Sequence, residues 1–137
     1  MTKGKKLFDA LMEVDVEMDG MMRLPGLHIQ SGGRHSEYQS TCLFSVDENL
    51  EVRVDKIIKK SLWDTGKPND ELRGCLYDIR FFIDRVEVVD CTEDQMEKLL
   101  GFAYDKINRE LDKYREKRKS LLQDYLDRKE RSVHQGR

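Results

Sequence analysis

The longest helical pattern in the chain covers residues 92–131, and it limits every fold that the sequence can adopt. Thr92 and Gln95 have the spacing of a capping box, in which a hydroxyl and an amide side chain satisfy free backbone N–H groups at a helix start. No proline follows Pro68, and Gly101 is the only glycine within the pattern. At 1.5 Å per residue the helix would be roughly 60 Å long, about twice the width of a small domain. Part of it must therefore project from the rest of the protein.

The apolar residues of this helix form a wide face at first and a narrow stripe later. Residues 96–107 present more than one apolar stripe, as expected of a helix that packs on its own domain. Beyond them the apolar positions fit a heptad repeat that Arg118 interrupts. A helix that folds back onto its own sheet would show the same narrow stripe. We predict a homo-oligomer whose interface contains Tyr104, Ile107, Leu111, Tyr114, Leu121 and Tyr125.

Charge divides the chain into two parts. Residues 106–137 contain eleven Lys or Arg and six Asp or Glu, a net charge of +5, which leaves −7 of the total of −2 for residues 1–105. We expect an acidic head (1–105), a projecting helix (106–131) and a frayed tail (132–137). Lys113, Lys117 and Arg118 lie in the densest basic run and are candidates for binding nucleic-acid phosphates. A solvated helix surface explains the run as well, because acidic residues interrupt it.

The first eighteen residues change their apolar period. Leu7 and Leu11 have helical spacing, whereas apolar and acidic residues alternate over 12–18, which predicts a half-buried strand. Glu13, Asp15 and Glu17 would then line one acidic face, and we expect a macromolecular partner to bind there. A turn is predicted at residues 19–20, which are Asp-Gly.

A glycine pair follows a short apolar run at residues 27–29. We expect a flexible connection into the next strand at this point. The alternative is a small-anion or nucleotide site at a subunit seam, in which backbone N–H groups and basic side chains surround the anion. Its candidate residues are Gly32, Gly33, Arg34 and His35. No phosphate-loop spacing follows the glycines, which favours the plain connection.

The clearest strand signal is a hairpin over residues 38–54. A three-residue loop at 47–49 would place Cys42 opposite Val54 and Phe44 opposite Val52, so that all of these apolar side chains share one face. Asn49 would take the left-handed backbone conformation that asparagine tolerates. Asp55 would then cap a short helix over residues 56–63.

Residues 72–89 fit either a helix or a strand. Their aromatic and β-branched side chains favour a strand with a bulge near Asp84 and Arg85. With the preceding segments, this predicts an α+β fold. An antiparallel sheet of about four or five strands would be packed by short helices and by one long C-terminal helix.

The sequence favours an interaction protein over an enzyme. Three widely spaced cysteines (Cys42, Cys75 and Cys91) suit a reducing, cytoplasmic compartment, and no apolar run approaches the length of a membrane span. The His and Cys residues lack metal-ligand spacing, so we expect neither a metal nor a cofactor. We expect a non-enzymatic homo-oligomer that binds an unidentified protein as an inhibitor, sequestering protein or adaptor. Nucleic-acid binding is the alternative.

Overall fold

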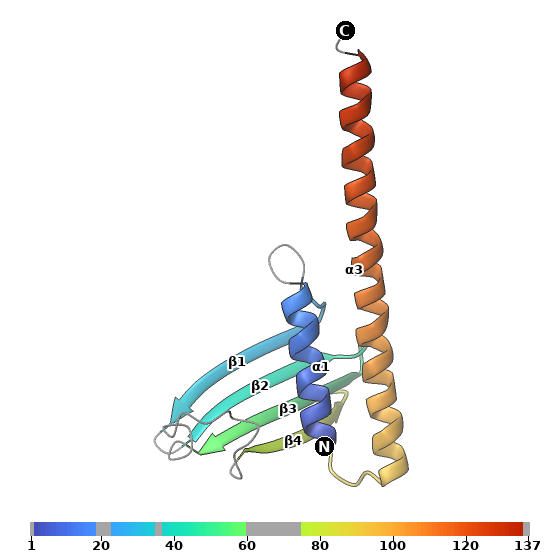
Figure 1. Ribbon diagram of the computed structural model, residues 1–137. Helices are drawn as coiled ribbons and strands as arrows, with labels where there is room; N and C mark the ends of the chain where they lie inside the picture. The colour runs from blue at the N-terminus through green and yellow to red at the C-terminus, as the bar shows by residue number, and fades with distance from the viewer. Residues whose placement is uncertain (1, 19–22, 35–36, 60–74, 136–137) are drawn as a thin grey trace.

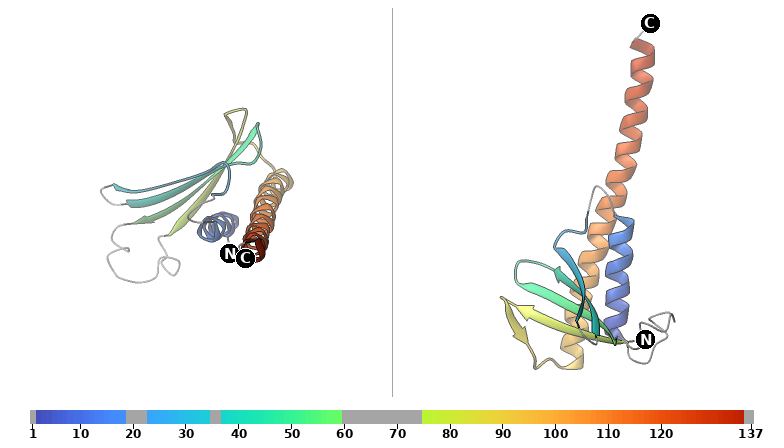
Figure 2. Two further views of the ribbon diagram at one scale, coloured as in Figure 1. Left: turned by 90° about the horizontal axis from the view of Figure 1, so that it is seen from above. Right: turned by 90° about the vertical axis from the view of Figure 1, so that its left-hand side faces the viewer.

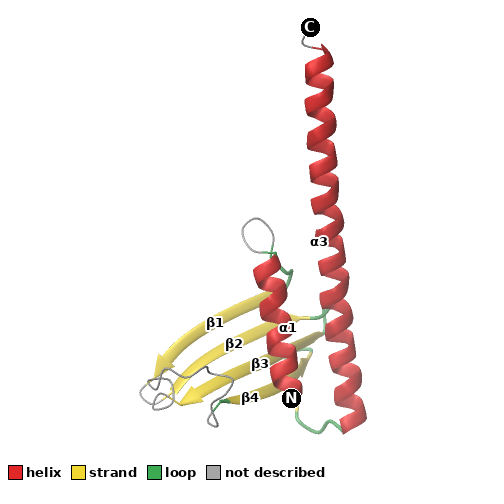
Figure 3. Cartoon of the chain, viewed as in Figure 1, coloured by secondary structure: helices red, strands yellow, loops and turns green. Residues whose placement is uncertain are grey.

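The computed structural model describes residues 2–18, 23–34, 37–59 and 75–135, and it has an α+β fold, as predicted (Figures 1 and 3). A first helix and a last helix flank five strands, all antiparallel to their neighbours and arranged in chain order in one sheet. The elements are α1 (Lys3–Glu17), β1 (Leu27–Arg34), β2 (Glu37–Ser45), β3 (Leu50–Lys59), β4 (Leu76–Ile83), β5 (Val86–Val88) and α3 (Glu93–Gln135).

The first helix corrects the prediction of a strand over residues 12–18. Thr2 caps α1 by accepting a hydrogen bond from the backbone N–H of Lys5 (3.1 Å), and the helix continues to Glu17. The helical spacing of Leu7, Leu11, Val14 and Met18 puts all four in the core, whereas Val16 is 71% exposed. The strand prediction was wrong because one continuous helical stripe buries more apolar surface than the alternating pattern could. The predicted turn at residues 19–20 lies outside the described residues.

The hairpin of β2 and β3 has the predicted register. Cys42 is paired with Val54 and Phe44 with Val52. The carboxylate of Asp47 closes the loop, because it accepts hydrogen bonds from the backbone N–H groups of Asn49 and Leu50 (both 2.8 Å). Asn49 does not adopt the left-handed conformation, so that part of the prediction was wrong.

The strands on either side of residues 60–74 also differ in detail from the prediction. β3 continues through Asp55 to Lys59, where we expected Asp55 to start a helix. Residues 76–83 and 86–88 are strands, which agrees with the favoured interpretation. The predicted bulge is instead a two-residue hairpin turn, in which Asp84 (φ 50°) and Arg85 (φ 69°) both have positive φ. The rest of the short helix predicted after Asp55 lies outside the described residues.

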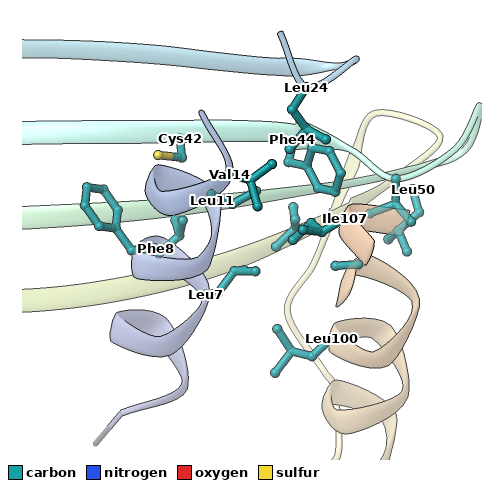
Figure 4. Packing of buried hydrophobic residues seen from close by; sticks show 14 of the residues in the cluster. Leu7, Phe8, Leu11, Val14, Leu24, Cys42, Phe44, Leu50, Leu100 and Ile107 are labelled. Carbon is teal, nitrogen blue, oxygen red and sulfur yellow. The ribbon is translucent and has the colours of Figure 1, made fainter. Parts of the chain in front are cut away.

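One face of the sheet carries the core. Figure 2 shows that α1 and the lower part of α3 lie on the same side of the curved sheet. Their side chains meet those of the central strands in one cluster, which includes Leu7, Leu11, Phe44, Leu50, Leu100 and Ile107 (Figure 4). At Gly4 a Cβ atom would lie 2.8 Å from the Cβ of Tyr77, so glycine allows the start of α1 to approach β4 this closely. The opposite face of the sheet is free of both helices.

Candidate interface on the distal helix

The start of α3 is fixed by reciprocal hydrogen bonds and by ion pairs to α1. The Gln95 side chain accepts from the backbone N–H of Thr92 (3.0 Å), and the Thr92 hydroxyl accepts from that of Gln95 (3.2 Å), which confirms the capping box. The ammonium of Lys3 lies 2.6 Å from a carboxylate oxygen of Glu93 and 2.7 Å from one of Glu97. Its hydrogen bond to Glu93 lowers the pKa of that carboxyl. The base of α3 is therefore attached to the beginning of α1.

A second ion pair joins the two helices at the far end of α1. The guanidinium of Arg115 donates two hydrogen bonds, both 3.0 Å long, to the carboxylate of Glu17. These bonds lower the pKa of Glu17 and raise that of Arg115. Arg115 therefore marks the level at which the described contacts between α1 and α3 end. We call residues 93–115 the proximal half of α3 and residues 116–135 the distal half.

The proximal half packs its apolar face on its own head. Leu100, Ala103 and Ile107 are buried in the core, and Leu111 and Tyr114 are half-buried against it. Tyr104 is also half-buried, and burial raises its pKa. Four of the six residues predicted for the oligomer interface thus contact the protein's own core: Tyr104, Ile107, Leu111 and Tyr114. In this half, the fold-back alternative describes the stripe correctly.

The distal half carries an apolar stripe that lies outside the hydrophobic core formed by the described residues. We call its four central residues the distal seam: Leu121 (55% exposed), Leu122 (61%), Tyr125 (50%) and Leu126 (45%). Val133, also exposed, extends it toward the end of the helix. Figure 1 shows this half of α3 extending well beyond α1 and the sheet. Leu121 and Tyr125 are the two predicted interface residues that remain available to a partner.

Two cations on the same side of the helix lie against tyrosine rings. The guanidinium carbon of Arg118 is 5.3 Å from the centre of the Tyr114 ring, and the ammonium of Lys129 is 5.7 Å from that of Tyr125. Such cation–π contacts are worth about 0.5–1 kcal/mol at exposed sites. The side chains of Arg118 and Lys129 therefore lie against the two rings. Their positive charges do not interrupt the apolar surface of the stripe.

The residues proposed for nucleic-acid binding do not form one cluster. Lys113 and Lys117 are one helical turn apart, but the ammonium of Lys113 lies 3.4 Å from the Glu110 carboxylate. Arg118 points about 100° away from Lys117 around the helix and rests on Tyr114. The exposed cations therefore share their surface with acidic neighbours.

The acidic residues of α1 do not share the face that we predicted for them, because they lie on a helix and not on a strand. Glu17 is paired with Arg115, while Glu13 is exposed one turn earlier. Asp15 projects to another side of α1. Burial raises the pKa of the Cys42 thiol to about 12, and the negative charge of Asp15 contributes to the same shift. The three residues do not form one acidic surface.

The glycine pair belongs to β1 and not to a loop. Gly32 is paired with Gln39 and Gly33 with Tyr38, so the prediction of a flexible connection at this point was wrong. The strand signal was weak because glycine supplies no side chain to the sheet. The backbone of Arg34 is paired with that of Glu37, and His35 lies outside the described residues. The glycines instead border a hollow on the open face of the sheet.

We did not predict from the sequence that the open face of the sheet holds a buried carboxylate, that of Asp55. Asp55 is only 2% exposed. Its oxygens accept hydrogen bonds from the Thr41 hydroxyl, from Gln39 Nε2 (3.1 Å) and from Arg53 Nε (3.1 Å). A hollow of about 340 Å³ lies over these strands and is lined by His28, Gln30, Thr41, Leu43, Glu51, Arg53, Phe82 and Arg85. The alternation of β3, which turns Glu51, Arg53 and Asp55 to one face, was the available signal.

Comparison of the chain with protein-family models, with curated proteins and with solved structures finds no match in any of the three. Among residues 2–18, 23–34, 37–59 and 75–135, no three His, Cys, Asp or Glu side chains are grouped so as to hold a metal ion. None of the described helices combines the length and the apolar character needed to cross a membrane.

Proposed function

We propose that the protein is a non-enzymatic homo-oligomeric interaction protein, assembled through the distal seam. The observation that carries the proposal is the exposure of four large apolar side chains on a helix whose proximal half buries the same face. Full burial of such a side chain contributes about 1.5–3 kcal/mol. A second copy of the seam would supply that burial, as facing stripes do in coiled coils.

The instability of a lone helix also supports this assignment. A helix without tertiary contacts is marginal in water, because most helical stability in proteins comes from the packing of an apolar face. The distal half has local support, including the hydrogen bond from Gln123 to Asp127 (2.9 Å). Such pairs contribute only about 0.2–0.5 kcal/mol each. Packing against another chain would add the missing contribution.

The head is the part we propose for binding a second macromolecule, as an inhibitor, sequestering protein or adaptor. Its net charge of −7 over residues 1–105 favours a basic partner. Because residues 13–17 do not form one acidic face, we propose that the partner binds at the hollow lined by Thr41, Glu51 and Arg53. The three cysteines are unpaired thiols, and we place the protein in the reducing cytoplasm.

Light scattering after size exclusion tests the assembly. We expect the wild type to be larger than a monomer at tens of micromolar, and Leu122→Asp to shift it to a monomer by placing a carboxylate in the seam. Ser120→Asp adds the same charge on the opposite side of the helix and serves as the matched control, with the wild-type mass expected. A monomeric wild type, or an equal effect of both variants, would show that the seam is not the interface.

A further inference from the structure

We infer that two copies pair antiparallel through their distal halves, so that the heads lie at opposite ends of a shared rod. The two-fold axis would cross the helices near Asp124. The inference rests on the proposed function and adds the orientation, the overlap and the position of the heads.

The first step is that the distal seam faces the same side of α3 as the head. Eighteen residues make five turns of a helix with 3.6 residues per turn. Leu121 therefore lies directly above Ala103, and Tyr125 directly above Ile107, and both lower residues are buried in the head. Leu122 has the same relation to Tyr104, which packs against the core. The seam thus continues the face that α1 and the sheet cover lower down.

The second step excludes a parallel pair. Two seams that face each other in parallel would place both heads in the space between the two helices. Packed helices have axes about 8–10 Å apart, and one helix with its side chains is already about 10 Å wide. Each head fills that side of α3 with α1 and the sheet (Figure 2). The two heads would collide, and the seams could not meet.

The third step is that an antiparallel pair avoids this collision. The head of each copy limits how far the two α3 helices can overlap. The tip of one helix can extend along its partner until it reaches the head, near the level of Arg115. With Ser132 of one copy at the level of Arg115 of the other, the two-fold axis lies between Gln123 and Asp124. Leu121 of one copy then lies level with Leu126 of the other, and Leu122 with Tyr125, so the distal seam is centred on this point. An isologous interface requires such self-matching, because the same patch is used on both copies.

Distance measurements between spin labels test the orientation. Cys75→Ser with Cys91→Ser supplies the background, in which the buried Cys42, with its raised pKa, does not react with the label. A label at Glu116→Cys and, separately, one at Asp124→Cys then report on the two copies of each site. Antiparallel pairing separates the two 116 sites by about 25 Å along the rod, at 1.5 Å per residue, but leaves the two 124 sites nearly level.

Three results decide the matter. A long distance at position 116 with a short one at position 124 is the expected result. Equal short distances at both positions would overturn the antiparallel arrangement and leave the homo-oligomer intact. A protein that is monomeric by light scattering, or an oligomer without measurable coupling at either position, would overturn the distal seam as an interface and the proposed function with it.

Discussion

The two halves of α3 show the same apolar face in two environments. In the proximal half the face is buried by α1 and the sheet, whereas in the distal half it is about half exposed. The two stretches lie on the same side of one continuous helix, so the neighbouring elements account for the difference in exposure. A helical stripe therefore shows which side of a helix is packed, and the surrounding fold determines whether the same chain or another one packs against it.

The largest difference between the halves should appear in stability. Leu100 is 5% exposed and Leu122 is 61% exposed, so the same substitution can be compared at both positions. We expect Leu100→Ala to lower the free energy of unfolding by about 2–5 kcal/mol, because it leaves a cavity in the core. Leu122→Ala should change it by less than about 0.5 kcal/mol when the protein is diluted to the monomer. Urea unfolding measures both, and similar losses would contradict the division of α3.

The next largest effect should come from the buried carboxylate of the head. Asp55→Ala removes an acceptor shared by Gln39, Thr41 and Arg53, and we expect a loss of about 1–3 kcal/mol. Arg53 is partly exposed, so water can take over part of its lost pairing. The matched control is Asp78→Ala on the same face of the sheet, where the carboxylate is half exposed. The mass of the oligomer should stay unchanged in both variants.

Salt separates self-association from nucleic-acid binding by the distal half. Residues 116–135 contain six Lys or Arg and four Asp or Glu, so two copies carry the same net charge of +2. Self-association should hold or strengthen as salt rises, because salt screens this repulsion. Binding to nucleic acid would weaken steeply, and Lys113→Glu, Lys117→Glu and Arg118→Glu together would abolish it. We expect no binding of duplex or single strands even at low salt, and a titration with a labelled duplex and a labelled single strand checks this.

The smallest effect should come from the exposed ion pair between Glu17 and Arg115. The pKa of Glu17 is lowered in the folded state, so the pair stabilises the protein above the ordinary glutamate pKa. That contribution is lost as the pH falls through the lowered value. The urea midpoint of Glu17→Gln should lie below that of the wild type at pH 7, and the two should converge at a pH below the lowered pKa of Glu17. Glu13→Gln, on the same helix, should match the wild type at both pH values.

The sequence predicted the parts of the fold that depend on residues close together in the chain, such as a helix cap or a hairpin loop. Thr92 and Gln95 identified the start of α3, and the apolar pairs around residues 47–49 gave the register of β2 and β3. The alternation over residues 12–18 was misleading, because α1 takes its stripe from Leu7, Leu11, Val14 and Met18 once a sheet is present to cover it. Asp55 was missed as a buried group because its burial depends on cross-strand neighbours. Only the assembled head shows that the stripe of α3 is covered as far as Tyr114 and bare beyond it.

Amide hydrogen exchange at two protein concentrations tests the contrast between the halves most directly. We expect the amides of the proximal half to exchange slowly and at the same rate in both samples, because the head protects them. Those of residues 118–130 should be protected at high concentration and exchange much faster on dilution, as the second copy dissociates. Protection of the distal half that does not change with concentration would contradict the account, because it would mean that no second copy covers the distal seam.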